Sequence, residues 1–441
     1  MSRTDSLTSP RRWQIRIFAV SWLTYAGYYL GRVNISVAMP ALQESFGWSR
    51  AALGLLGSLF FWVYAFSQLI NGHVGDRVSA RRFIAVGLLL SAGLNALAGS
   101  LSTYGLLVLV WAINGWAQAT GWGPMMRTLS RWFSPKQRGR LTAFFAPCYV
   151  VGNAFAWMLA GWMIAVGGWR WAFWGPAILL VAIAGMWFWG VRDRPTSSVS
   201  SPNEAEPAAN GSIWQGLIAL WQRPAMRSAL AICLLSGMIK DGLTLWGPTY
   251  LMEQGNLPLT TAALIAVALP IAGALGAFLA GWLMHRWTQD REMPVVAGLA
   301  ALVVVSVAGL YIWAGASAAA VSLALLAMMA LGSHGTNALL MASVPLSLGP
   351  RGNVSSAAGT LDFTSYVGGG LSALLVGALQ DLAGWSAVYL WWGVVAAVIA
   401  VIAIGAARSP VPVAQSKEHA GEIPRPSPAM SGSQPSSSGE E

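Results

Sequence analysis

Long, almost uncharged apolar stretches recur along nearly the whole chain, and they constrain its fold more than any other feature. A run of about 18 or more apolar residues is long enough to cross the hydrocarbon core of a bilayer as a helix. Charged residues make up only 10% of the chain, against about 25% in an ordinary soluble domain. A membrane barrel would show alternating polarity instead of solid apolar runs. The sequence therefore predicts an all-α polytopic membrane protein.

The apolar stretches and the charges between them predict twelve transmembrane helices. The predicted spans are 14–42, 51–73, 83–101, 104–130, 139–166, 170–191, 227–252, 260–285, 293–314, 317–347, 353–380 and 385–407. With both termini in the cytoplasm, only Arg50 and Arg170 of the 26 Lys and Arg residues lie outside, and only Arg32 and Lys240 lie within the membrane. Positive residues stay on the inner side during insertion. We therefore expect a multi-pass protein of the inner (plasma) membrane with cytoplasmic termini, and we attribute the net charge of +10 to topology and not to nucleic-acid binding.

Several landmarks of the first half recur in the same order in the second half. Arg32 matches Lys240, "GHVGDR" (72–77) matches "GWLMHR" (281–286), and "GWRWAF" (168–173) matches "GWSAVY" (384–389). Two pseudo-symmetric six-helix bundles with a site between them are a transporter architecture. The predicted parts are a first bundle (1–191), a cytoplasmic linker with an interfacial helix (192–226), a second bundle (227–408) and a disordered cytoplasmic tail (409–441).

Arg32 lies near the middle of the first predicted span, where a charge is costly. A central arginine disfavours insertion by about 2.5–3.5 kcal/mol, so such a residue usually faces a protein-lined cavity. Lys240 has the equivalent place in the second half, and the pseudo-two-fold therefore brings the two residues across one cavity. A guanidinium binds phosphate or carboxylate through two parallel hydrogen bonds, and an ammonium adds a point charge. We predict an anion clamp at mid-membrane.

The loop after the second span reads "GHVGDRVSARR" (72–82). In this place the pattern G-x-x-x-D-R-x-x-x-R-R resembles the signature of the major facilitator superfamily. The resemblance implies the fold of that superfamily, and it implies a conformational latch that holds the two halves in one access state. The implied latch residues are Gly72, Asp76, Arg77, Arg81 and Arg82. The second copy of the motif has His285 in the aspartate's place, which leaves its latch in question.

A narrower resemblance begins at "YAGYYLGRVN" (25–34) and extends through "ATGWGPMMRTLSRWFSPKQRGR" (119–140) and "LWGPTYL" (245–251). These stretches resemble the organophosphate:phosphate antiporters, and the resemblance as a whole extends over essentially all twelve spans. The resemblance implies a phosphate site with one basic residue on the first helix and another on the seventh. It implies these substrate-binding positions: Arg32, Lys240, Tyr25, Tyr28, Tyr29, Tyr149 and Gln68.

Several of these positions depart from the antiporter pattern. Lys240 replaces an arginine, Gln68 replaces a lysine, Tyr149 replaces a histidine, and Gly237 replaces a tyrosine. The stretch "GRVNISVAMP" (31–40) also resembles the anion:cation symporters, which carry carboxylates. The sequence therefore leaves the substrate open among phosphate esters, phosphonates and carboxylates.

Three further polar residues within spans are predicted to couple transport to an ion: Asp362, Asp241 and His334. Because neighbouring helix positions point about 100° apart, Lys240 and Asp241 are not expected to face the cavity together. We expect Asp362 to pair with Lys240 in the empty protein until substrate or a proton displaces it. A packing role is the alternative for Asp241 and for His334.

Together these features predict a secondary transporter that moves a small organic anion by alternating access, and the predicted anion is phosphorylated. The counter-ion or co-ion is expected to be phosphate or a proton. The alternatives are a carboxylate/proton symporter and a transporter-like membrane sensor. There is no P-loop, zinc motif or nucleophile elbow, so we expect no enzyme activity and no cofactor. The expected partners are the small anionic substrate and the lipid bilayer, without nucleic acid, and the expected state is a monomer.

Overall fold

The computed structural model describes residues 10–133, 137, 145, 147–193, 222, 224–288, 291–313, 319–347 and 354–408. Within this part of the chain the structure is helical and contains no strand. The predicted interfacial helix and the predicted tail after residue 408 lie outside the described residues. Helix α11 begins at Pro224, inside the predicted linker.

Fourteen of the fifteen elements below are α-helices, and η1 is a short 3-10 helix. Their bounds are α1 (Pro10–Tyr28), η1 (Tyr29–Gly31), α2 (Asn34–Phe46), α3 (Arg50–Arg77), α4 (Ala80–Ser100), α5 (Tyr104–Gln118), α6 (Trp122–Trp132), α8 (Pro147–Gly167), α9 (Trp171–Gly190), α11 (Pro224–Gln254), α12 (Leu259–Ile265), α13 (Ala268–Trp287), α14 (Glu292–Trp313), α15 (Ala319–Ser347) and α16 (Val354–Arg408).

Nine helices of the described chain are long and apolar enough to cross a membrane. One of them, Ala357–Arg408, contains two predicted spans. A kink at Ala383 and Gly384 separates these spans, and Gly384 has a φ of 68° that favours glycine. The predicted spans 14–42 and 104–130 are helical but interrupted, as α1–η1–α2 and α5–α6. All twelve predicted spans thus coincide with helical segments where the structure describes them.

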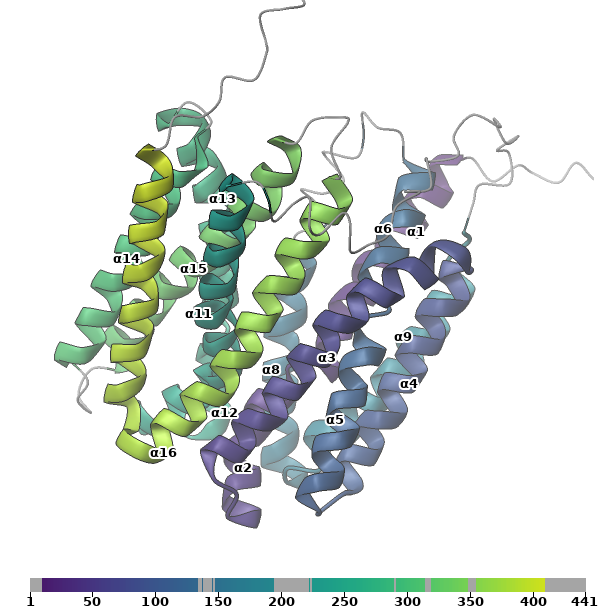
Figure 1. Cartoon of the computed structure of the whole chain (residues 1–441). Helices are drawn as coiled ribbons and strands as arrows, with labels where there is room; N and C mark the ends of the chain where they lie inside the picture. The colour runs from purple at the N-terminus through teal and green to yellow at the C-terminus, as the bar shows by residue number, and fades with distance from the viewer. Residues whose placement is uncertain are drawn as a thin grey trace, which may run out of the picture. The chain divides into compact units, whose positions relative to one another are not determined.

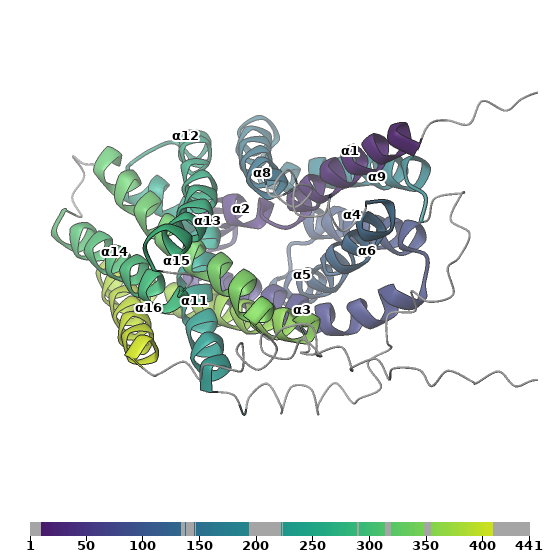
Figure 2. The same ribbon diagram turned by 90° about the horizontal axis from the view of Figure 1, so that it is seen from above.

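The helices form two groups that correspond to the two halves of the sequence (Figures 1 and 2). In the first group α4 packs against α9 and α5, and α1 packs against α9 and α8. In the second group α15 packs against α13, α14 and α11. The groups meet where α2 contacts α11, where α8 contacts α12 and α13, and along the pair α3 and α16.

Small residues bring α3 and α16 into backbone contact near the N-terminal end of α3. A Cβ on Gly54 would collide with the carbonyl oxygen of Ala373, and a Cβ on Gly377 would collide with that of Arg50. Small residues allow this close approach of membrane helices. The two groups are therefore tightly joined at the Arg50 end of α3.

Polar contacts reinforce the same end. The Asp381 carboxylate accepts hydrogen bonds from the backbone N–H groups of Arg50 (3.1 Å) and Ala51 (2.8 Å), at the start of α3. A carboxylate there compensates the unpaired N–H groups and the positive end of the helix dipole. The Arg50 guanidinium also forms an ion pair of 2.9 Å with Glu253, which accepts a hydrogen bond from Trp385. We call Arg50, Glu253, Asp381 and Trp385 the end cluster.

Candidate functional site

Arg32 lies at a break in the first predicted span. Helix α1 ends at Tyr28, η1 covers Tyr29–Gly31, and α2 starts only at Asn34. The sequence predicts one continuous helix for this span, so the break is a correction. Discontinuous helices at membrane depth are tolerated where the freed backbone groups find partners within the protein.

Buried side-chain amides supply those partners. The Gly31 carbonyl oxygen accepts hydrogen bonds from Asn114 (2.8 Å) and Asn95 (3.3 Å). The Asn34 amide donates to Asn95 (2.9 Å) and to the Ala172 carbonyl oxygen (2.8 Å). Buried polar groups require such hydrogen bonds. These asparagines therefore fix the break that carries Arg32.

Arg32 is 7% exposed, and in the described part of the chain its guanidinium is held by uncharged groups. Its Nε donates to the Gln118 side-chain oxygen (3.3 Å), and one terminal nitrogen donates to the Tyr64 hydroxyl (3.2 Å). It also lies over the rings of Tyr29 (5.0 Å) and Tyr64 (4.5 Å), which attract a cation electrostatically. The charge is therefore positioned but not neutralised by any of these partners.

Lys240 and Asp241 form an ion pair on α11, with 2.6 Å between Nζ and Oδ1. Both side chains line the same cavity as Arg32. This overturns the expectation that neighbours on a helix cannot both face the cavity, because the flexible lysine stem bends back to its neighbour. It also overturns the expected pairing of Lys240 with Asp362 in the empty protein.

The Asp241 carboxylate fits against a glycine of α16. A Cβ on Gly369 would lie 2.6 Å from Asp241 Oδ2 and 2.8 Å from its Cβ. We therefore expect Gly369→Ala to displace Asp241 and to destabilise the protein by about 1–3 kcal/mol. The matched control is Gly359→Ala on the same helix, where a Cβ meets nothing within 4 Å. It should stabilise the helix by about 0.8–1 kcal/mol. Melting of the two purified variants tests this prediction, and equal stability would contradict it.

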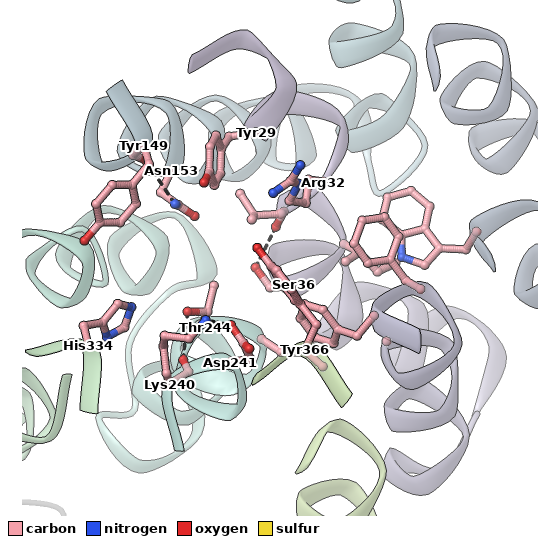
Figure 3. A pocket seen from close by; sticks show the side chains of 17 residues that line it. Tyr29, Arg32, Ser36, Tyr149, Asn153, Lys240, Asp241, Thr244, His334 and Tyr366 are labelled. Atoms are coloured by element: carbon pink, nitrogen blue, oxygen red, sulfur yellow. Dashed lines mark hydrogen bonds and ion pairs between the residues drawn. The ribbon is translucent and has the colours of Figure 1, made fainter. Parts of the chain in front are cut away.

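One cavity collects most of the predicted site (Figure 3). Figure 3 shows Arg32 and Tyr29 on one side, with Lys240, Asp241 and Thr244 facing them from α11. The other labelled side chains are Ser36, Tyr149, Asn153, His334 and Tyr366. About 690 Å³ of empty space is present, part of it open to the surroundings.

Two predicted substrate-binding tyrosines lie outside this cavity lining. Tyr28 is fully buried, and its hydroxyl is 3.1 Å from that of Thr120. The Tyr25 ring packs against Trp122 and Phe145, at centroid distances of 4.9 and 5.9 Å. A helix presents only part of its circumference to one cavity. The structure therefore gives these two side chains packing contacts and leaves Tyr29 on the cavity side.

Gln68 and Asp362 also lie outside the cavity lining, and they contact each other. The Gln68 amide of α3 donates to Asp362 Oδ2 of α16 across 3.0 Å. The ring of Tyr64 meets that of Tyr366 in the same pair of helices, at 4.7 Å. Positions four residues apart share a helix face. The two contacts are therefore successive layers of one interface between the two groups.

Gly237 has a packing function. A Cβ at this position would collide with the Ser365 carbonyl oxygen of α16. The tyrosine found here in the antiporter pattern has no room in this chain. The departure at Gly237 thus follows from the close approach of α11 and α16.

Only part of the predicted latch is described. Arg77 and Arg82 are exposed. Arg81 donates its Nε to the Phe188 carbonyl oxygen, and its backbone N–H donates to Asp193 (2.9 Å). The surroundings of Gly72 and the side chain of Asp76 lie outside the described part. The described contacts of Arg81 stay within the first group of helices.

Several polar residues that build the site were not predicted from the sequence. They are Tyr64, Gln118, Asn95, Asn114 and Tyr366. The sequence did contain a signal for the three amides. An amide within the apolar stretches 83–101 and 104–130 is costly to bury unless it has a hydrogen-bond partner. Nothing in the sequence indicates which partner each amide finds.

Comparison with known protein families identifies the superfamily to which the chain belongs. The model of the Major Facilitator Superfamily matches residues 21–373. The chain belongs to the major facilitator superfamily. It is a multi-pass membrane protein with an all-helical fold, as the sequence predicted.

Relatives resemble the chain over most of its length. A probable hexose phosphate transport protein of Chlamydia pneumoniae is 24% identical and covers 86% of this chain and 88% of its own. A glycerol-3-phosphate transporter of Bacillus subtilis is 29% identical, with 85% and 88% covered. The membrane sensor protein UhpC of Salmonella typhimurium is 27% identical, with 70% and 72% covered. These relatives confirm the resemblance to organophosphate:phosphate antiporters, and their names are those of transporters or a sensor, not of enzymes.

Solved structures confirm the fold. A bacterial homolog of the lysosomal transporter Spinster matches with a TM-score of 0.75 at 16% identity, covering 89% of this chain and 96% of its own. The nucleoside transporter NupG matches with a TM-score of 0.65 at 16% identity, covering 89% of this chain and 98% of its own.

Proposed function

We propose that this protein is a secondary transporter that carries a small phosphorylated organic anion across the inner membrane by alternating access. Arg32 and Lys240 bind the anion between the two groups of helices. Both termini and the segment 192–226 lie in the cytoplasm, and one chain forms the working unit. Phosphate in exchange, or a proton in symport, drives the cycle.

The observation that carries this proposal is the burial of the Arg32 guanidinium among uncharged groups. The guanidinium is buried in a cavity, and its contacts among the described residues are with amide, hydroxyl and ring groups. A buried charge is costly unless a counter-charge satisfies it. The tyrosines and Gln118 hold the guanidinium in place, so an entering phosphoryl group finds an oriented pair of donors. The names of the relatives supply the phosphorylated class.

The proposed cycle is based on where the two groups of helices contact each other. The end cluster and the glycine contacts join the groups at the Arg50 end of α3. We assign this arrangement to a state closed at the Arg50 end, and we assign access to the Arg77 end. Gly72, Asp76, Arg77, Arg81 and Arg82 would latch the opposite state. Asp241, Asp362 and His334 are the groups proposed to take part in coupling.

A sensor is the second candidate function, because a relative of similar identity is named a membrane sensor protein. A sensor binds the same anion but does not move it. Binding alone therefore does not separate the two functions, whereas uptake does. A carboxylate/proton symporter is the third candidate. It predicts that carboxylates bind more tightly than phosphate esters.

A ligand screen by thermal shift tests the substrate class. Phosphate esters and phosphonates are expected to raise the melting temperature of the purified protein more than matched carboxylates do. A ligand at about 100 times its Kd stabilises by about 2.7 kcal/mol. The Arg32→Gln variant should lose this response. A larger response to carboxylates would favour the symporter, and a response to neutral sugars alone would contradict the anion site.

A further inference from the structure

The charge of Asp241 depends on Lys240. The Asp241 carboxylate is buried, and its Oδ1 accepts a hydrogen bond from the Lys240 ammonium at 2.6 Å. Its Oδ2 packs against Gly369 and has no hydrogen-bond partner among the described residues. A buried carboxylate is costly unless a counter-charge or hydrogen bonds satisfy it. If Lys240 moved away, neither oxygen of this carboxylate would keep a described hydrogen-bond partner.

Lys240 is also one of the two cations proposed to bind the anion. Its Nζ lies 5.2 Å from the centre of the Tyr366 ring. The Arg32 guanidinium lies 4.5 Å from the Tyr64 ring, whose centre is 4.7 Å from that of Tyr366. The two cations therefore border the same pair of rings, and both line one cavity. Because an ammonium on a flexible stem changes partners readily, an anion bound by Arg32 competes with Asp241 for Lys240.

The charges of the cavity favour a proton as the replacement for Lys240. Among the described residues that line the cavity, the lysines, arginines and carboxylates are Arg32, Lys240 and Asp241. A phosphomonoester carries about two negative charges at neutral pH. With Asp241 ionised, the loaded site would have an excess of negative charge, whereas with Asp241 protonated the charges balance. A balanced site is less costly within the membrane interior.

Other ionisable side chains lie around Asp241, on the cavity lining and on α16. Those of the lining are Tyr29, Tyr149, His334 and Tyr366. One ring nitrogen of His334 is 3.0 Å from a backbone carbonyl oxygen of its own helix. Asp362 of α16 lies outside the lining, against Gln68. The helices α2, α12 and α13 also pack against α11, and they add no ionisable side chain to the described lining. The hydrogen bond and ion pair described for the Asp241 carboxylate thus both come from Lys240.

We infer that the coupling ion is a proton, and that it binds the Asp241 carboxylate when the substrate takes Lys240. The Lys240 ammonium exchanges its hydrogen bond to Oδ1 for one to the phosphoryl group and keeps its own protons. Oδ1 then forms an O–H bond with a proton that comes from water on the open side. When the anion leaves, Lys240 returns to Asp241 and the proton is released. This inference rests on the proposed function, and it narrows the three proposed coupling groups to one.

Proton counting at pH 7.5 tests this inference. The second pKa of a phosphate ester is about 6, so ethyl phosphate is almost fully dianionic at this pH. Its binding to the purified full-length protein would be measured by calorimetry in two buffers of different ionisation enthalpy. We expect the wild type to take up about one proton per bound ester, so that its affinity falls about tenfold per unit as the pH is raised. Asp241→Asn should lose both the proton uptake and this pH dependence.

Two further variants make the assignment specific. Lys240→Gln removes the partner of Asp241, so the carboxylate is expected to be protonated before the ester arrives. Binding through Arg32 should then take up no proton. Asp362→Asn should keep the uptake, because Asp362 contacts Gln68 and does not line the cavity. Melting curves of the purified variants establish that each is folded.

The outcomes separate this inference from the proposed function. If ethyl phosphate binds and Arg32→Gln abolishes that binding, but no proton is taken up, the inference is wrong and the anion site stands. Uptake that persists in Asp241→Asn would also contradict it, because the proton would then bind His334 or the ester itself. Loss of uptake in Asp362→Asn alone would assign the proton to Asp362 instead. If ethyl phosphate and other phosphate esters all fail to bind, the proposed function and this inference are both wrong.

Discussion

Arg32→Gln is expected to weaken substrate binding by about 30-fold to several thousandfold. Truncating one partner of a buried charge pair costs about 2–5 kcal/mol, and each 1.4 kcal/mol is about tenfold in affinity. Glutamine retains a donor of similar length but loses the charge and the two-pronged geometry. Arg32→Lys should also lose most of the affinity, because an ammonium cannot bond Gln118 and Tyr64 while presenting two donors to the anion.

The matched control for Arg32 is Arg170→Gln. Arg170 lies over the Trp169 ring and donates to Ser102, and it does not line the cavity. Its replacement should leave affinity within about twofold, as expected for a surface change. Titration of the same phosphate ester into wild type and both variants gives the comparison. Equal affinity of Arg32→Gln and wild type would remove Arg32 from the binding site.

Gly54→Ala is expected to open the contact between α3 and α16 at the Arg50 end. The added methyl group collides with the Ala373 carbonyl oxygen, which belongs to the backbone and has little room to move. Overpacking of this kind costs about 1–3 kcal/mol. The closed arrangement should therefore lose about 5- to 150-fold in population against the opposite state. Turnover should fall by a similar factor while the protein stays folded.

Thiol labelling measures this shift. Ser58 is fully buried and donates to the Gly370 carbonyl oxygen in the joined arrangement. A cysteine at position 58 should react faster in the Gly54→Ala background, after Cys148 and Cys233 are replaced. The matched control is Gly93→Ala, since a Cβ on Gly93 meets nothing within 4 Å. Equal labelling rates in the two backgrounds would show that the contact does not control access.

The helices were predictable because the bilayer imposes a strong local rule. A span must be long and apolar, and every backbone group must find an internal partner. The interruptions were not predictable in the same way. The break that contains Arg32 is stable because Asn95 and Asn114 of other helices bond the Gly31 carbonyl oxygen. Such a partnership depends on tertiary packing and leaves no periodic signal.

The basic residues of the site were predictable, but their pairing was not. Arg32 and Lys240 stand out because a charge within an apolar span is costly. Which acid Lys240 contacts depends on the bend of its side chain and on the space beside Gly369. Likewise, Asp362 binds Gln68 because α3 and α16 are in register at this layer. These facts belong to the interface between the two groups of helices and follow from their docking.

Exchange transport in proteoliposomes tests the central claim most directly. Vesicles containing the purified protein would be loaded with unlabelled phosphate ester and given the labelled ester outside. We expect rapid accumulation of label in wild type and none above empty vesicles in Arg32→Gln. Tight binding without any uptake would favour the sensor, and uptake that survives Arg32→Gln would contradict a transport site built on Arg32.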